Sequence, residues 1–228
     1  MIDQRRILSD KKVKTIILTP FLILVLMAFI TLYPGTRDFG IWLLAENKPV
    51  ELLTFVIFII GSVYGMKFSF NISKNHKYYI VLFYGVFSFF LFFIAMEEIA
   101  WGQQFFDFKT PTSWKKINLQ GETTLHNIEG LQGKSEIFRL LFGLGGIFGI
   151  WLDRFSLFND ISPSKILWSW FIVITIHAGI DLYADTITIN EFYDRGLQRT
   201  SELIELLIAM SSVLYLWLNK KKLLEPQF

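Results

Sequence analysis

The sequence predicts an all-α integral membrane protein, a bundle of about six transmembrane helices with a long extracytoplasmic loop between the third and the fourth. Hydrophobic residues make up 53% and aromatic residues 17% of the 228-residue chain, which is more apolar surface than a soluble domain of this size can bury. Six segments contain the roughly 20 apolar residues that a helix needs to cross a bilayer. Basic residues gather in alternate connections, as they do on the cytoplasmic side of multi-pass proteins.

The spans belong to a single polytopic domain, residues 1–228. In chain order we expect them at 14–33, 49–70, 78–106, 136–156, 164–186 and 200–219. The first is not a cleavable signal, because its apolar run is long and no small-residue cleavage pattern follows it. The third is longer than a bilayer requires, so we expect it to tilt or to project beyond the membrane. The fourth is rich in glycine, which lets neighbouring helices approach closely.

The positive charge of the loops predicts which side of the membrane each loop faces. The basic residues before and at the start of the first span, from the end of the second span to the third, and after the sixth span are Arg5, Arg6, Lys11, Lys12, Lys14, Lys67, Lys74, Lys77, Lys220, Lys221 and Lys222. All of them fall on one side if the chain crosses six times, and that side should be cytoplasmic. We therefore expect a bacterial cytoplasmic (inner) membrane protein with both termini in the cytoplasm. The connection 107–135 then lies on the extracytoplasmic side.

Composition also excludes several classes of partner and site. The net charge of +2 is small, so it gives no reason to expect a nucleic-acid partner, and the lipid bilayer is the partner that the composition predicts. Because the chain has no cysteine, disulfides and thiolate metal sites are excluded.

The third span ends with two adjacent acids, Glu97 and Glu98. The helix dipole is negative at that end, so carboxylates are disfavoured there unless something offsets their charge. One interpretation is a carboxylate ligand or a general base, because ionisable residues in or near lipid are costly. The alternative is a helix end that lies above the lipid and carries ordinary solvated acids.

The loop after the third span contains Glu122 and His126, four residues apart. If this segment is helical, the two side chains share a face. A carboxylate and an imidazole at this spacing can bind one metal ion, or they can form a simple hydrogen bond to each other.

The fifth span has His177, Asp181 and Asp185 at a spacing of four, which makes a stripe on one helical face. His177 lies inside an apolar run, where a single histidine can be a satisfied core residue. With Asp181 one turn away, a ligand pair or a proton relay is favoured. Asp185 is nearer the span end, where solvation is an equal explanation.

The sixth span begins with Glu202 and Glu205, three residues apart on one face. Acids in a first helical turn are stabilised by the dipole and need no further role. Glu205 is the deeper of the two, and Arg199 is close enough in sequence to neutralise either acid.

Two sequence runs carry a resemblance. The run EEIAWGQ at 97–103, followed by NLQGETTLHN at 118–127, resembles a group of uncharacterised bacterial multi-pass membrane proteins. The match covers about 30 residues around the third span and the following loop. The resemblance implies a multi-pass membrane fold and brings no established activity with it.

Three functions compete. The leading hypothesis is a metal-dependent hydrolase or transferase that acts on a lipid-like substrate from an extracytoplasmic site, with Glu97 or Glu202 as the general base. Its divalent metal, which would be zinc, iron or manganese, is expected to be bound by ligands drawn from Glu98, Glu122, His126, His177, Asp181 and Glu205. The alternatives are an ion- or proton-coupled transporter or channel, and a non-catalytic membrane accessory subunit.

Overall fold

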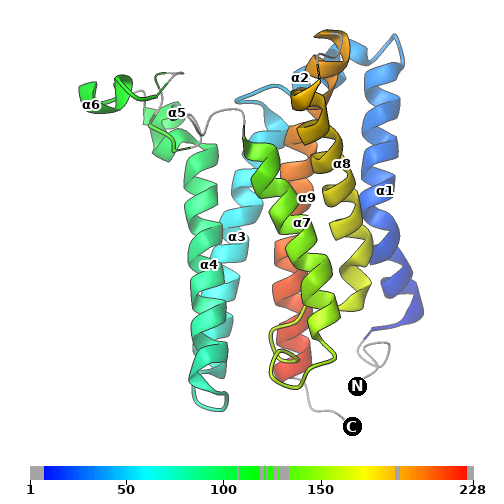
Figure 1. The fold of residues 1–228 in the computed structure, drawn as a ribbon, viewed down its shortest axis with the longest axis vertical. Helices are drawn as coiled ribbons and strands as arrows, with labels where there is room; N and C mark the ends of the chain where they lie inside the picture. Colours follow the sequence, from blue (N-terminus) through cyan, green and yellow to red (C-terminus); the bar gives the residue numbers. More distant parts are fainter. Residues whose placement is uncertain are drawn as a thin grey trace.

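The computed structural model describes residues 8–106, 108–118, 121, 123–125, 128, 134–187 and 191–224. These residues form helices joined by loops, and the only β-pairing among them is an isolated antiparallel bridge between Asn118 and Ile128. Within the described part, six helices are long and apolar enough to cross a membrane. They stand side by side as a bundle (Figure 1). The predicted all-helical, multi-pass architecture is therefore confirmed at this level.

Each predicted span overlaps one long helix. The six long helices are α1 (Asp10–Leu32), α3 (Pro49–Ile72), α4 (Tyr78–Glu98), α7 (Ser135–Leu152), α8 (Trp168–Thr186) and α9 (Glu191–Leu224). Short helices lie between them: α2 (Arg37–Leu43), η2 (Ala100–Gly102), α5 (Gln103–Phe106), α6 (Thr112–Lys115) and η3 (Lys165–Leu167). Helix α1 begins and α9 ends at the same end of the bundle (Figure 1), which we call the proximal end. The opposite end, where α4 ends and α7 begins, is the distal end.

The third helix is shorter than the sequence suggested. We expected it to continue to residue 106, but α4 ends at Glu98. The cause lies in the next residues: Ala100, Trp101 and Gly102 have φ angles of 46°, 55° and 91°, a left-handed backbone that cannot continue a right-handed helix. The chain turns away at this point, so Glu97 and Glu98 occupy the last turn of α4 at the distal end.

The last helix begins earlier than expected. Helix α9 starts at Glu191 rather than at residue 200. Glu202 and Glu205 therefore lie beyond its first turn, so the alternative in which the helix N-terminus accounts for Glu202 does not apply. The field of a helix end acts mainly within the first turn, so these two acids must find their partners in neighbouring helices.

Helix α9 is the centre of the bundle. In its most apolar window 67% of the residues are buried, against 6% for α1 at the periphery. Helix α3 packs against α4 and α9, while α7 packs against α8. The indole Nε1 of Trp170, a fully buried residue of α8, donates a hydrogen bond of 2.9 Å to the carbonyl of Ile16, which fastens α1 to the bundle.

The glycines of α7 set how closely α8 approaches. A Cβ at Gly143 would lie 2.4 Å from Thr175 Oγ1 and 3.0 Å from the backbone nitrogen of Thr175, so only glycine fits without a shift. Gly146 faces the ring of Phe171 in the same way. Gly145 differs, because a Cβ there would meet nothing within 4 Å. The glycine-rich span thus packs through some of its glycines and leaves open space beside another.

Several polar side chains connect the loop after α7 to the proximal half of the bundle. The hydroxyl of Tyr84 donates to the carbonyl of Asp160 at 2.7 Å and accepts from Nδ2 of Asn219 at 2.9 Å. The hydroxyl of Tyr215 donates to the carbonyl of Ile161 at 2.6 Å. Lys222 pairs with Asp153 at 3.3 Å. These contacts fix the connection between α7 and α8 against α4 and α9.

Candidate functional site

A buried arginine joins three helices near the distal end. Arg139 of α7 places Nη2 2.7 Å from Oδ2 of Asp181 in α8, and Nη1 2.9 Å from Oε1 of Glu205 in α9. The side chains of Arg139 and Asp181 are only 7% and 12% exposed. A charge this far from solvent is costly unless it is paired, so the contact holds the three helices in one arrangement. We call Arg139, Asp181 and Glu205 the arginine clamp.

Two consecutive hydroxyls of α9 extend the clamp toward α8. The Ser201 hydroxyl donates to Oδ2 of Asp181 at 3.2 Å, and Thr200 Oγ1 lies 2.7 Å from Nε2 of His177. Nδ1 of His177 is buried and has no hydrogen-bond partner among the described residues. The structure thus gives His177 and Asp181, one turn apart on α8, different partners on neighbouring positions of α9.

Acids from three helices gather on the side of the clamp where Glu205 lies. The charge of Glu98 on α4 interacts with those of Glu51 on α3, Glu202 and Glu205 on α9, and its neighbour Glu97. Glu51, Glu97, Glu98, Glu202 and Glu205 form what we call the distal acid cluster. Both Glu98 and Glu202 are half-buried. The structure thus brings Glu98 of the third span near Glu202 and Glu205 of the sixth span, together with Glu51 of the second span.

Glu97 is held by two hydrogen bonds. The indole Nε1 of Trp101 donates to its Oε1 at 2.6 Å, and the backbone N–H of Leu125 donates to its Oε2 at 2.7 Å. The left-handed turn after α4 brings Trp101 back over the helix end, and this makes the first contact possible. Both carboxylate oxygens thus fasten the segment after α4 to the helix.

Gln103 makes a second link to the same segment. Its side-chain oxygen accepts from the backbone N–H of Thr123 at 3.0 Å, and its Nε2 lies 2.9 Å from Oγ1 of Thr110. The two runs that carry the sequence resemblance, 97–103 and 118–127, are therefore joined by Glu97 to Leu125 and by Gln103 to Thr123.

Three predicted site positions cannot be placed. Glu122 and His126 lie outside the described residues, and so does the side chain of Asp185. The described neighbours of Glu122 and His126 lie in bends and in the bridge to Asn118, not in a helix. In the described part of the chain, no group of three or more histidine, aspartate or glutamate residues is arranged to hold a metal ion.

Sequence reasoning missed the residue that organises the site. The sequence patterns predict no role for Arg139, nor for Thr200 and Ser201. The available signal was the position of Arg139 inside an otherwise apolar span, because intramembrane arginines are usually paired. Glu136, one turn earlier on α7, is buried at 4% exposure and gives the same signal.

Comparisons of the chain with models of protein families, with curated proteins and with solved structures found no match. Support for a function therefore comes from the geometry and charges of the distal end.

Proposed function

We propose that the protein is a membrane-embedded enzyme that uses a divalent cation at the distal end to act on the polar head of a lipid-like substrate. The observation that supports the proposal is the excess of carboxylates around Arg139. The membrane is proposed to be the bacterial inner membrane, with the proximal end in the cytoplasm. The distal acid cluster would then face the extracytoplasmic side, where it is within reach of lipid head groups.

The electrostatic argument starts from the clamp. Arg139 divides its single positive charge between Asp181 and Glu205. The acids of the distal cluster are close enough to repel one another when they are ionised, and Arg139 is the positive charge that acts on Glu202. Repulsion between carboxylates is strong where the surroundings have a low dielectric constant. A bound divalent cation would convert this repulsion into attraction.

The contacts of the clamp support different roles for the predicted ligands. Asp181 and Glu205 already bind a guanidinium, and Nε2 of His177 already contacts Thr200, so these three residues are proposed to position α8 and α9. Glu98 is proposed to bind the cation. Glu122 and His126 are the further ligands that the sequence predicts. Carboxylates together with an imidazole suit zinc, iron or manganese.

The chemistry would follow from such a site. Glu98, with Glu122 and His126, would hold the cation, which would supply Lewis-acid chemistry toward an ester, amide or phosphate oxygen and toward water. A carboxylate that does not bind the cation takes the proton of that water as general base, and Glu202 is the proposed residue. Glu97, whose two oxygens hold Trp101 and Leu125, is proposed to position the covering segment rather than to take up protons.

Elemental analysis of detergent-purified protein tests the cation. We expect zinc, iron or manganese to copurify, and addition of the metal to raise the melting temperature while a chelator lowers it. Glu98→Gln should lose both the metal and the stabilisation, whereas Glu202→Gln, which removes the proposed general base, should keep both. Asp38→Asn is the matched control, because Asp38 is an exposed acid of α2. Metal-free protein whose melting temperature ignores all three metals would overturn the proposal.

One observation favours a second function, a proton- or ion-coupled transporter. Nδ1 of His177 is buried and without a described partner, and it lies on the same helix as the clamp carboxylate Asp181. Intramembrane histidines and carboxylates form proton relays in transporters. Proton flux into proteoliposomes separates the two functions: a transporter predicts a flux that His177→Gln abolishes, whereas the enzyme predicts no flux above that of empty vesicles.

A further inference from the structure

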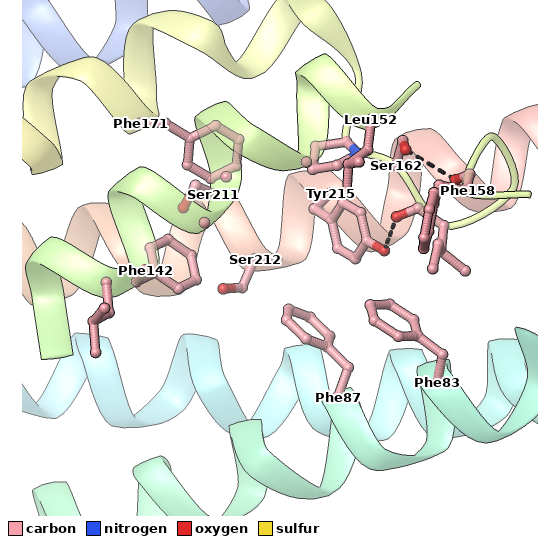
Figure 2. A pocket seen from close by; sticks show the side chains of 16 residues that line it. Phe83, Phe87, Phe142, Leu152, Phe158, Ser162, Phe171, Ser211, Ser212 and Tyr215 are labelled. Atoms are coloured by element: carbon pink, nitrogen blue, oxygen red, sulfur yellow. Dashed lines mark hydrogen bonds between the residues drawn. The ribbon is translucent and has the colours of Figure 1, made fainter. Parts of the chain in front are cut away.

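A cavity of about 330 Å³ lies between α4 and α7, with α9 behind it (Figure 2). Most of its wall is aromatic or aliphatic. Phe83 and Phe87 line it from α4, Phe142 from α7, Phe171 from α8, and Ser212 and Tyr215 from α9. This volume is in the range of sites that bind small apolar molecules.

The cavity reaches the outer surface of the bundle within the spanning helices. Its wall on α7 runs from Leu141 to Leu152, a length of about 16 Å at the rise of an α-helix. Two of its lining residues, Leu141 and Phe83, are 60% and 37% exposed. In a membrane this part of the surface faces lipid hydrocarbon rather than water. The molecules that meet the opening between α4 and α7 are therefore lipid chains.

Part of the cavity stays open because Gly145 has no side chain. Gly145 lines the cavity, and a Cβ at this position would meet nothing within 4 Å. The neighbouring lining glycines, Gly146 and Gly149, are in contact with Phe171 and Pro163 instead. Gly145 is thus the position at which a larger residue would fill the cavity without disturbing helix packing.

One wall residue offers a polar contact. Ser212 is 1% exposed, and its hydroxyl has no hydrogen-bond partner among the described residues. The adjacent Ser211 differs, because its hydroxyl donates to the carbonyl of Ile208 at 2.9 Å. A buried hydroxyl that makes no hydrogen bond is costly, so a bound molecule with an acceptor oxygen is favoured over a pure hydrocarbon.

We propose that this cavity binds one acyl chain of a membrane lipid, which enters between α4 and α7 and accepts a hydrogen bond from Ser212 at its ester carbonyl. Figure 2 shows Ser212 beside Phe142 and Phe87, with Tyr215 and Phe158 further along the cavity. Because Ser212 follows Glu205 by seven residues on α9, it lies about 10 Å further from the distal end. The chain would then extend toward the proximal end, with its head group on the distal side.

The proposal rests on the cavity and not on chemistry at the distal acid cluster. A lipid bound here would be a substrate if the proposed enzyme function holds, and a structural lipid if that function fails. Metal content does not report on this cavity, and lipid labelling does not report on the metal. The two proposals therefore fail independently.

Photolabelling of the full chain in vesicles tests the occupant. The vesicles contain phosphatidylethanolamine and phosphatidylglycerol with a trace of phosphatidylcholine that has a diazirine on one acyl chain. We expect labels on cavity residues such as Phe87 and Phe142, and Gly145→Phe should reduce them to background. Gly179→Phe is the matched control, because Gly179 is a glycine of α8 whose Cβ would also meet nothing within 4 Å.

Two serine variants test the proposed hydrogen bond from Ser212 to the ester carbonyl of the lipid. Ser212→Ala should lower cavity labelling about fivefold, the loss of one ordinary hydrogen bond, whereas Ser211→Ala should leave it unchanged. An ether-linked analogue without the carbonyl should label the wild type as weakly as the ester lipid labels Ser212→Ala. Equal labelling by the ester and ether lipids would overturn the carbonyl contact.

Labelling can also contradict the proposal that an acyl chain occupies the cavity. If Gly145→Phe is labelled at Phe87 and Phe142 as strongly as the wild type, no chain occupies the cavity. The same conclusion follows if these positions are labelled no more than Leu22 of α1, which is 63% exposed and contacts bulk lipid. Gel filtration confirms that each variant is folded before labelling.

Discussion

Arg139 and Asp181 form a buried ion pair across α7 and α8, with Nη2 2.7 Å from Oδ2. The pair specifies how α7 and α8 pack at the distal end. A guanidinium that is only 7% exposed is costly unless carboxylates pair with it. Its second contact, to Glu205, brings α9 into the same arrangement. Asp181 and Glu205 are therefore held at fixed positions relative to one another.

Arg139→Leu should destabilise the protein by about 3–5 kcal/mol, because it leaves Asp181 buried without its partner. Thermal unfolding in detergent measures the loss. The triple variant Arg139→Leu, Asp181→Asn, Glu205→Gln removes the uncompensated charges and should recover much of the stability. If Arg139→Leu alone melts at the wild-type temperature, the clamp does not stabilise the bundle.

The surroundings of two glycines in α7 predict that replacing them by alanine changes the stability of the protein in opposite directions. Gly143→Ala should destabilise by about 1–3 kcal/mol, because the new Cβ overlaps Thr175 and must push α8 away. Gly145→Ala should stabilise by about 0.5–1 kcal/mol, because alanine is the better helix former and its Cβ meets nothing within 4 Å. Melting temperatures of the two variants decide the matter, and effects of the same sign would contradict the packing described here.

Tyr84→Phe should cost about 1–3 kcal/mol, because it leaves the Asp160 carbonyl and the Asn219 amide without the hydroxyl that bonds both. Tyr78→Phe is the control on the same helix, since Tyr78 is 78% exposed. Chemical or thermal unfolding of the two variants side by side gives the difference. Equal stabilities would mean that the loop after α7 is not held by Tyr84.

Topology is tested by reporters at the two ends of the bundle. A reporter fused at Phe228 should lie in the cytoplasm, whereas one inserted after Thr112 should lie outside it. Helix α6, which begins at Thr112, lies at the distal end, and α9 ends at the proximal end (Figure 1). Alkaline phosphatase, active only outside the cytoplasm, reads out both positions. The six-span arrangement would be wrong if both reporters gave the same compartment.

The coarse fold could be predicted from the sequence, whereas helix ends could not. Apolar runs of sufficient length identify α1, α3, α4, α7, α8 and α9 because each must satisfy its own backbone within the bilayer. The end of α4 depends on three successive left-handed residues, of which only Gly102 favours that conformation by itself. The start of α9 at Glu191 carries no such signal, because polar residues there continue the helix beyond the apolar run.

The sequence by itself determined the helical membrane class and the number of candidate spans, because these depend on composition and on position along the chain. Only the tertiary structure decided which acids are neutralised. Arg139, Asp181 and Glu205 are far apart in sequence, and their contact depends on how α7, α8 and α9 pack. The cavity beside Gly145 was equally hidden, because whether a glycine makes a close contact or leaves open space depends on the neighbouring helix rather than on the glycine itself.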